Sequence, residues 1–196
     1  MVFSSGIACA LLAATLGLSQ PELDRALTGV PAVRTERFLL ENQKAAGRGV
    51  GAVAIERPIG EVWAVISRFD DKAEYMPRVK KVDILSASQG QLRVRMLVDA
   101  SVTTARYTAL FQLDQAAHKI SFHLDKSAPD NTIADTVGSY ELFALTGQRT
   151  LLLYRAYVDT GRAIPGFISD YMARRSMPKL LWAVKKRTET GGTYRK

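Results

Sequence analysis

The longest helical pattern in the chain runs from residue 164 to residue 187, after a region that reads mainly as β-strands, and this order constrains the fold most. In each half of the pattern, apolar residues recur at the i, i+3, i+4 and i+7 positions of one helical face. At roughly 100° per residue, the second stripe lies nearly opposite the first. Pro178 stands at the change, where its ring and its missing N–H favour a bend or a restart near Met177. We therefore predict a bent helix whose halves contact different parts of the fold through two stripes: Ile164, Phe167, Ile168 and Tyr171, then Met177, Leu180, Leu181 and Val184.

The region before this helix alternates apolar and polar residues over several stretches, which is the pattern of antiparallel strands with one buried face. Pro58 suits the first turn of a helix and interrupts the strand pattern. The expected order is a strand at 50–56, short helices at 59–68 and 71–75, and strands at 79–85, 92–100, 106–113, 120–125, 136–145 and 150–159. This order predicts an α+β domain with a curved antiparallel sheet of about six to seven strands.

A sheet with one apolar face must bury that face, and only the C-terminal helix, at about 1.5 Å per residue, is long enough to cross it. A strongly curved sheet wrapped around one helix tends to leave an apolar cavity, which suits a small hydrophobic molecule. We expect the apolar registers of the strands and the facing side of the helix to line this cavity. These residues are Val94, Met96, Tyr107, Ala109, Phe111 and Tyr157 from the sheet, and Phe167, Ile168, Tyr171 and Met172 from the helix.

The net charge of +8 is concentrated near the C-terminal end of the sequence. Residues 162–196 hold nine Lys or Arg against Asp170 and Glu189, so the remainder is nearly neutral. A basic helix can contact an anionic membrane surface, where each cation contributes about 1 kcal/mol. The alternative is a solvated helix face whose cations offset the helix dipole. Nucleic-acid binding is not indicated, because Tyr171 and Trp182 are better explained as packing residues than as stacking platforms.

Residues 6–18 form an apolar run of the length of a signal-peptide core, too short to cross a bilayer. Gly17 and Ser19 are small enough for cleavage after Ser19, although no Lys or Arg precedes the run. Secretion or periplasmic export directed by residues 1–19 is slightly favoured over a cytoplasmic location. The alternatives to a signal peptide are a helix packed on the domain and a mobile N-terminus. We divide the rest into an extension at 20–46 with a short helix and an extra strand, a ligand-binding domain at 47–190, and a tail at 191–196.

The residue types needed for metal or nucleophilic chemistry are scarce. Cys9 is the single cysteine, and His118 and His123 are the two histidines. A cysteine-based zinc site and an aligned Ser-His-acid group are therefore not expected. We assign no catalytic residue, no metal site and no cofactor.

Five stretches of the chain carry a family resemblance: 53–71, 75–82, Gly138-Ser-Tyr-Glu-Leu142, Ile164-Pro-Gly-Phe167 and 173–181. Together they resemble the START-like superfamily, also called SRPBCC, and within it the polyketide cyclase/dehydrase and coenzyme Q-binding branch. The resemblance covers about residues 47–190, and Tyr140 stands where family members often have Trp. It implies the helix-grip fold, in which a curved antiparallel sheet wraps around a long C-terminal helix.

The resemblance implies two functions that share one cavity. The leading hypothesis is a non-catalytic binder or carrier of a hydrophobic molecule: a lipid, an isoprenoid quinone or a polyketide-like compound. The alternative is a cyclase or dehydratase acting on a similar ligand. For that alternative, Tyr107, Arg155 and Tyr157 could polarise a ketone if their registers face the cavity, although each is also an ordinary sheet residue.

Overall fold

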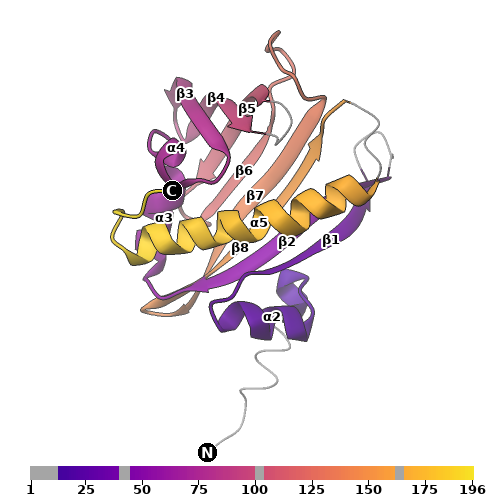
Figure 1. Ribbon diagram of the computed structural model, residues 1–196. Coiled ribbons are helices and arrows are strands. Elements are labelled where there is room, and N and C mark those ends of the chain that lie inside the picture. Colours follow the sequence, from indigo (N-terminus) through magenta and orange to yellow (C-terminus); the bar gives the residue numbers. More distant parts are fainter. Residues whose placement is uncertain (1–12, 40–44, 100–103, 162–165) are drawn as a thin grey trace, which may run out of the picture.

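The computed structural model describes residues 13–39, 45–99, 104–161 and 166–196, with the backbone alone at 38, 45 and 166–174. One antiparallel sheet lies at its centre, with eight strands in the spatial order β1-β2-β8-β7-β6-β5-β4-β3 (Figure 1). The strands are β1 (Ala32–Leu39), β2 (Ala45–Ile55), β3 (Val79–Ser88), β4 (Gln91–Asp99), β5 (Thr104–Asp114), β6 (Lys119–Leu124), β7 (Asp135–Thr146) and β8 (Arg149–Asp159). The sheet is accompanied by helices α2 (Gln20–Leu27), α3 (Ile59–Ser67), α4 (Lys72–Tyr75) and α5 (Gly166–Glu189). This is the α+β helix-grip arrangement that the sequence predicts.

The sheet is larger than the roughly six to seven strands expected from alternation. The extra edge strand, β1, pairs with β2 in register from Ala32 opposite Ala52 to Leu39 opposite Ala45. Strand β2 begins five residues before the predicted start at Val50, so it is long enough to pair with β1 on one side and β8 on the other. The N-terminal extension therefore supplies one edge of the sheet.

Strands β3 to β8 are neighbours in the same order as in the sequence, so short connections join most of them. Between β3 and β4, Gln89 and Gly90 have positive φ angles of 46° and 79°. Two successive positive φ values fit the turn whose twist matches that of flanking antiparallel strands. The chain therefore reverses direction in a tight turn at these two residues.

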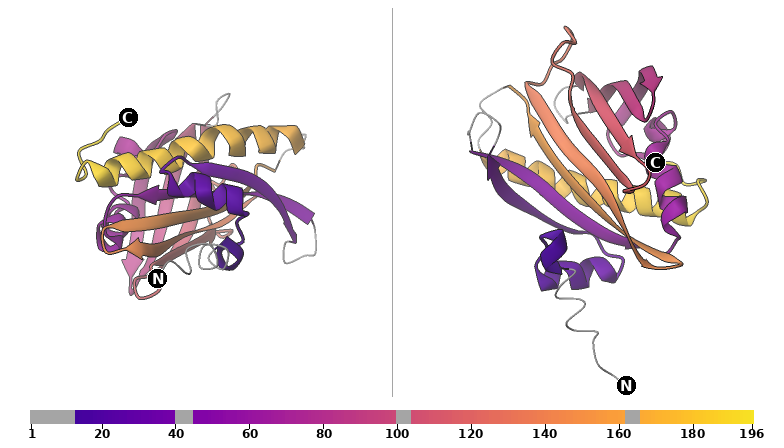
Figure 2. Two further views of the ribbon diagram at one scale, coloured as in Figure 1. Left: turned by 90° about the horizontal axis from the view of Figure 1, so that it is seen from below. Right: turned by 180° about the vertical axis from the view of Figure 1, so that it is seen from behind.

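The two faces of the sheet are covered by different parts of the chain (Figures 1 and 2). Helices α3, α4 and α5 lie on one face. The buried apolar residues on this side, called the inner cluster, are Val53, Ile55, Val62, Ile66, Phe69, Tyr75, Met76, Val79, Val94, Met96, Ala109, Phe111, Ile120, Phe122, Tyr140, Leu142, Leu152, Tyr154, Met177, Leu181, Ala183 and Val184.

Residues 13–18 and helix α2 cover the other face at β1, β2 and β8. The buried residues here, called the outer cluster, are Ala13, Leu16, Leu18, Leu23, Ala26, Ala32, Val50, Ala52, Ala54, Leu151 and Leu153. The Arg155 guanidinium donates to the Leu16 carbonyl at 2.7 Å, and Ser19 and Glu22 form a capping box at the start of α2. Residues 13–18 thus pack on the domain, as the alternative to a signal peptide expects, and cleavage after Ser19 stays a prediction.

Helix α5 continues through Pro178 without a restart, and the predicted bend near Met177 stays a prediction. The second apolar stripe is confirmed, because Met177, Leu181 and Val184 are buried and Leu180 is half-buried against the inner cluster. The first stripe lies outside the described side chains. In the described part of the chain, no helix combines the length and apolarity needed to cross a bilayer.

Gly51 of β2 lets the second half of α5 lie close to the sheet. A Cβ atom at this position would lie 2.7 Å from Leu181 Cδ1 and 2.9 Å from Met177 Sδ. These distances are shorter than van der Waals contact, so a larger residue would push the helix away from β2. The glycine therefore helps to fix the distance between sheet and helix.

Several C-terminal cations make internal contacts. Buried Arg187 donates to Asp71 at 2.8 Å, and the Lys185 ammonium donates to the Ala54 carbonyl at 3.1 Å. Lys196 donates to a backbone carbonyl in the segment after α4. Part of the C-terminal charge therefore holds α5 and the chain end against the domain.

Candidate ligand-binding site

Five of the six strand residues expected to line a cavity lie on the face of the sheet that α5 covers. Val94, Met96, Ala109 and Phe111 belong to the inner cluster, and Tyr107 packs against it. Strands β4 and β5 bring them together, since Val94 lies opposite Ala109 and Met96 opposite Tyr107. Burial raises the pKa of Tyr107 to about 12, which keeps its hydroxyl neutral at physiological pH. The structure groups these five residues, and their role in ligand binding stays a prediction.

Tyr157 does not belong to this group, and its expected orientation is wrong. In β8, Tyr154 and Ala156 contact the inner cluster. Because side chains alternate along a strand, Arg155 and Tyr157 lie on the other face. The Arg155 guanidinium is 2.9 Å from the Glu141 carboxylate on that face. A role for Arg155 or Tyr157 in chemistry beneath α5 is therefore not supported.

The remaining predicted site residues come from the first half of α5. The helix backbone passes through their positions, but their side chains lie outside the described part of the chain: Phe167, Ile168, Tyr171 and Met172. Their predicted contact with a ligand stays a prediction.

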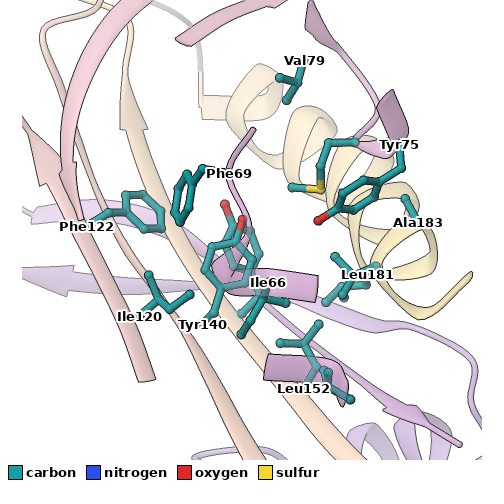
Figure 3. Close-up of a cluster of buried hydrophobic side chains, with 14 of the residues drawn as sticks. Ile66, Phe69, Tyr75, Val79, Ile120, Phe122, Tyr140, Leu152, Leu181 and Ala183 are labelled. Atoms are coloured by element: carbon teal, nitrogen blue, oxygen red, sulfur yellow. The ribbon is translucent and has the colours of Figure 1, made fainter. Parts of the chain in front are cut away.

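A row of aromatic rings runs through the inner cluster from Phe69, just after α3, to Tyr154 of β8. Figure 3 shows three of its members, Phe69, Phe122 and Tyr140. Ring centroids are 4.6 Å apart for Phe69 and Phe111, 5.4 Å for Phe111 and Phe122, 6.2 Å for Phe122 and Tyr140, and 4.5 Å for Tyr140 and Tyr154. These separations are typical of offset and edge-on aromatic contacts. The four rings from the strands retain 6–9% exposure. The row therefore offers flat apolar surface with a few hydroxyl groups.

Gly138 leaves room for the Phe122 ring, one member of the row. It lies opposite Phe122 in the β6–β7 pair. A Cβ atom at Gly138 would be 2.3 Å from the Phe122 ring and 2.3 Å from the Arg155 carbonyl oxygen. The Phe122 ring therefore lies directly across the glycine backbone, and Tyr140, two residues on, points to the same face. This packing explains why the Gly138-to-Leu142 motif has glycine at its first position and an aromatic residue at its third.

Lys72 of α4 places an ammonium group beside the ring row. Its side chain is 3% exposed, and Nζ donates to the Ile66 carbonyl at 2.7 Å. Nζ lies 4.5 Å from the Phe69 ring centroid and 5.7 Å from that of Tyr140. Burial lowers the pKa of Lys72 to about 8, and the negative charge of Asp71 offsets part of that effect.

Buried tyrosine hydroxyls add neutral polar groups to the inner cluster. Burial raises the pKa of Tyr75, Tyr140 and Tyr154 well above the ordinary range. Tyr75 adds to the rise in the pKa of Tyr140, and Tyr140 adds to the rise in that of Tyr154, whereas the hydrogen bond with Tyr154 lowers the pKa of Tyr140. Tyr75 donates to the Val65 carbonyl at 3.4 Å. At physiological pH these groups act as hydrogen-bond donors and acceptors and carry no charge.

The sequence prediction of the site did not include Phe69, Phe122, Tyr140, Tyr154 or Lys72. The alternation of 120–125 already places Phe122 on the apolar register, and the family motif contains Tyr140. Both could have been found from those two signals. Lys72 has no sequence signal, because a lysine in a short surface helix is normally exposed.

Two hollows lie among the described side chains without any of the predicted site residues in their linings. One, of about 390 Å³, lies between the end of α4 and the second half of α5, around Trp182 and Tyr194. The other, of about 250 Å³, lies on β3–β5 between Arg95, Arg106 and Asp130. The predicted space beneath the first half of α5 borders side chains outside the described part. Within the described ranges, no three His, Cys, Asp or Glu residues gather as metal ligands would.

Residues 55–185, more than half of the chain, match the family described as polyketide cyclase/dehydrase and lipid transport. The chain belongs to this family. The sequence resemblance to the START-like superfamily is thereby confirmed. A comparison with curated proteins gave no match.

Solved structures of this superfamily share the fold. Human StAR-related lipid transfer protein 5 is 13% identical with a TM-score of 0.66, over 94% of this chain and 98% of that one. A START superfamily protein from Mycobacterium smegmatis is 17% identical with a TM-score of 0.64, over 73% and 97%. An aromatase/cyclase from a Streptomyces species is 22% identical with a TM-score of 0.61, over 80% and 94%. These similarities establish the helix-grip fold of the family.

Proposed function

We propose that this protein binds or carries a hydrophobic small molecule, such as a lipid, an isoprenoid quinone or a polyketide-like compound, between the sheet and α5. The family description names lipid transport beside polyketide cyclase/dehydrase, and both activities act on molecules of this class. The observation that carries the proposal is the row of rings from Phe69 to Tyr154 on the face covered by α5. Ring faces and aliphatic side chains bind an apolar ligand through desolvation and close packing.

The exposure of the row supports the same function. Phe122 and Tyr154 are each 9% exposed, whereas their neighbours Ile120 and Leu152 are fully buried. The two aromatic residues are therefore covered less completely than the aliphatic residues beside them. A ligand on this face would cover area that the protein itself leaves exposed.

Mass spectrometry of the purified protein tests this proposal. We expect a non-covalent adduct under native conditions and recovery of an intact lipid, quinone or polyketide after solvent extraction. Ala156→Phe places a ring in the inner cluster and should abolish the adduct. Val137→Phe places the same ring on the outer register, at a residue that is 40% exposed, and should not. Absence of an adduct from the wild-type protein, together with no uptake of N-phenyl-naphthylamine, would overturn the proposal.

A cyclase or dehydratase activity in the same space is the second candidate. It is favoured by the neutral hydroxyls of Tyr107 and Tyr140 and the ammonium of Lys72, which are groups that can hold a ketone oxygen as it gains charge. Incubation with a short poly-β-ketone thioester distinguishes the two candidates. An enzyme would release a cyclised product that has lost water, and a carrier would return the compound unchanged.

Peripheral contact with an anionic membrane is also proposed for the outer side of α5. Trp182 is 42% exposed, and the Lys186 ammonium lies 5.4 Å from its ring centroid. Exposed Trp next to Lys is suited to the boundary between lipid headgroups and acyl chains. Co-sedimentation with phosphatidylglycerol vesicles should fall for Trp182→Ala and at high salt. Equal binding to neutral phosphatidylcholine vesicles would contradict this contact.

A further inference from the structure

The ammonium group of Lys72 is buried and has few hydrogen-bond acceptors around it. Its side chain is 3% exposed, and in the described ranges its hydrogen bond is the one from Nζ to the Ile66 carbonyl at 2.7 Å. An ammonium has three N–H donors and accepts nothing. Two of the three therefore find no acceptor among the described residues.

No carboxylate among the described residues lies within 4.0 Å of Lys72. Asp71 is its neighbour in sequence, but one carboxylate oxygen of Asp71 is 2.8 Å from the Arg187 guanidinium. A buried charge is costly unless a counter-charge and hydrogen bonds compensate for it. The neighbouring rings of Phe69 and Tyr140 compensate only in part.

We infer that Lys72 is the polar anchor of the site and that the natural ligand is a hydrophobic acid, whose carboxylate or acidic phenol oxygen accepts from the Lys72 ammonium. This inference rests on the proposed function, since it uses the ring row as the apolar surface for the rest of the molecule. The ammonium stands beside Phe69 and Tyr140, two members of that row. An oxygen anion there would supply the missing acceptor and a counter-charge in direct contact with the ammonium.

The ionisable groups next to Lys72 do not change their charge near neutral to mildly basic pH, so Lys72 is the one of this group that titrates there. Asp71 is paired with Arg187, which stays protonated. Tyr75 and Tyr140 have pKa values above the ordinary tyrosine range, so they remain neutral in that interval. Burial lowers the pKa of Lys72 to about 8, and an anion bound beside it would raise that value. Binding of an acid at about pH 8.5 should therefore draw a proton from solution.

The alternative is that Lys72 only closes the last turn of α3 through the Ile66 carbonyl. That role requires no ligand, so it predicts the same affinity for an acid and for its neutral ester. It also predicts no uptake of protons on binding.

Two pairs of probes test the anchor: parinaric acid with its methyl ester, and emodin with its methyl ether. The wild-type protein should bind the acidic member of a pair about tenfold or more tightly than the neutral one, the value of a charge-assisted hydrogen bond. Lys72→Met should remove this preference and keep the binding of the neutral member. Lys80→Met removes an exposed charge of the same kind and should keep the preference.

Calorimetry of the wild-type protein in buffers of different ionisation enthalpy measures proton uptake on binding. This measurement does not depend on the folding of any variant. Proton uptake with the acid and none with the ester supports the anchor, even if Lys72→Met fails to fold. Equal affinities within both pairs, without proton uptake, overturn the anchor and leave the proposed function standing. If no probe of either pair binds, the proposed function fails, and the anchor fails with it.

Discussion

The inner and outer clusters cover opposite faces of the same sheet, yet their chemistry differs. The outer cluster consists of aliphatic side chains contributed by residues 13–18, α2 and three strands. The inner cluster contains the ring row, buried tyrosine hydroxyls, and the ammonium of Lys72 beside them. Aliphatic packing alone is sufficient to cover a sheet face, as the outer cluster demonstrates.

The polar groups of the inner cluster therefore need another explanation. Burying a hydroxyl or an ammonium in an apolar core reduces stability unless each group finds partners. Lys72 has one hydrogen-bond partner among the described residues, and its pKa is lowered to about 8 by burial. A protein often retains such costly groups where they contact a ligand. The outer face thus only stabilises the fold, whereas the inner face is also suited to binding a ligand.

Matched leucine truncations should show this separation with the largest effect. Leu16 of the outer cluster is 1% exposed and Leu181 of the inner cluster is fully buried. Either Leu→Ala change should lower the free energy of unfolding by about 2–5 kcal/mol, because each leaves a cavity in packed surroundings. Urea unfolding measures both. Only Leu181→Ala should also change the affinity for N-phenyl-naphthylamine, measured under conditions where both variants are folded.

A loss of probe affinity in Leu16→Ala equal to that in Leu181→Ala would contradict a ligand site confined to the inner face. It would mean that the probe binds on the outer face or senses global stability alone.

The pH dependence of stability should isolate Lys72 with an effect of intermediate size. The pKa of this lysine is about 8 in the folded protein and has its ordinary value, near 10.5, in the unfolded chain. Between these values the unfolded chain binds more protons, so the free energy of unfolding rises with pH. The destabilising contribution is fully present below about pH 8 and disappears toward pH 10.5. From about pH 7.5 to 9.5, wild type should gain about 2 kcal/mol relative to Lys72→Met.

Urea unfolding of both proteins at the two pH values gives this difference directly. The comparison between proteins removes the contributions of other titrating groups, including the tyrosines. Parallel stability curves for the two proteins would show that Lys72 is not desolvated as the structure indicates.

Gly51→Ala should lower the free energy of unfolding least of the three changes. It tests how closely β2 and α5 pack. The added Cβ would meet Leu181 Cδ1 at 2.7 Å and Met177 Sδ at 2.9 Å, both near the ends of adaptable side chains. We expect a loss of about 1–2 kcal/mol, in the lower part of the range for overpacked cores. In a Leu181→Ala background the loss should shrink, because the main clash is gone. Additive losses in the double variant would contradict a direct contact.

The sequence predicted the fold well and the orientation of β8 poorly, for a physical reason. Strands such as β6 alternate between buried and more exposed residues, so the apolar register can be assigned from the sequence. In β8, residues 150–154 are buried on both faces, because α3 packs on one and residues 13–18 with α2 cover the other. The alternation is lost in that run, and the sequence does not reveal which face Tyr157 takes.

The position of Lys72 could not be predicted for a related reason. Local sequence indicates a short helix at 71–75, and it forms at Lys72–Tyr75. Whether its lysine points to solvent or inward depends on how α3 and α4 pack, and the Ile66 carbonyl and the Phe69 ring complete the site only in the folded state. Long-range packing decided this part of the site, whereas hydrophobic periodicity was enough for the strands.

The most direct test of a ligand site on the inner face is NMR of the protein with labelled leucine methyl groups, titrated with parinaric acid. With a ligand on the inner face, the methyl signals of Leu152 and Leu181 in the inner cluster should shift, while those of Leu16, Leu151 and Leu153 in the outer cluster should not. Leu151 and Leu152 are adjacent in β8, so the comparison holds even within one strand. Shifts confined to the outer leucines, or spread equally over both clusters, would contradict the account.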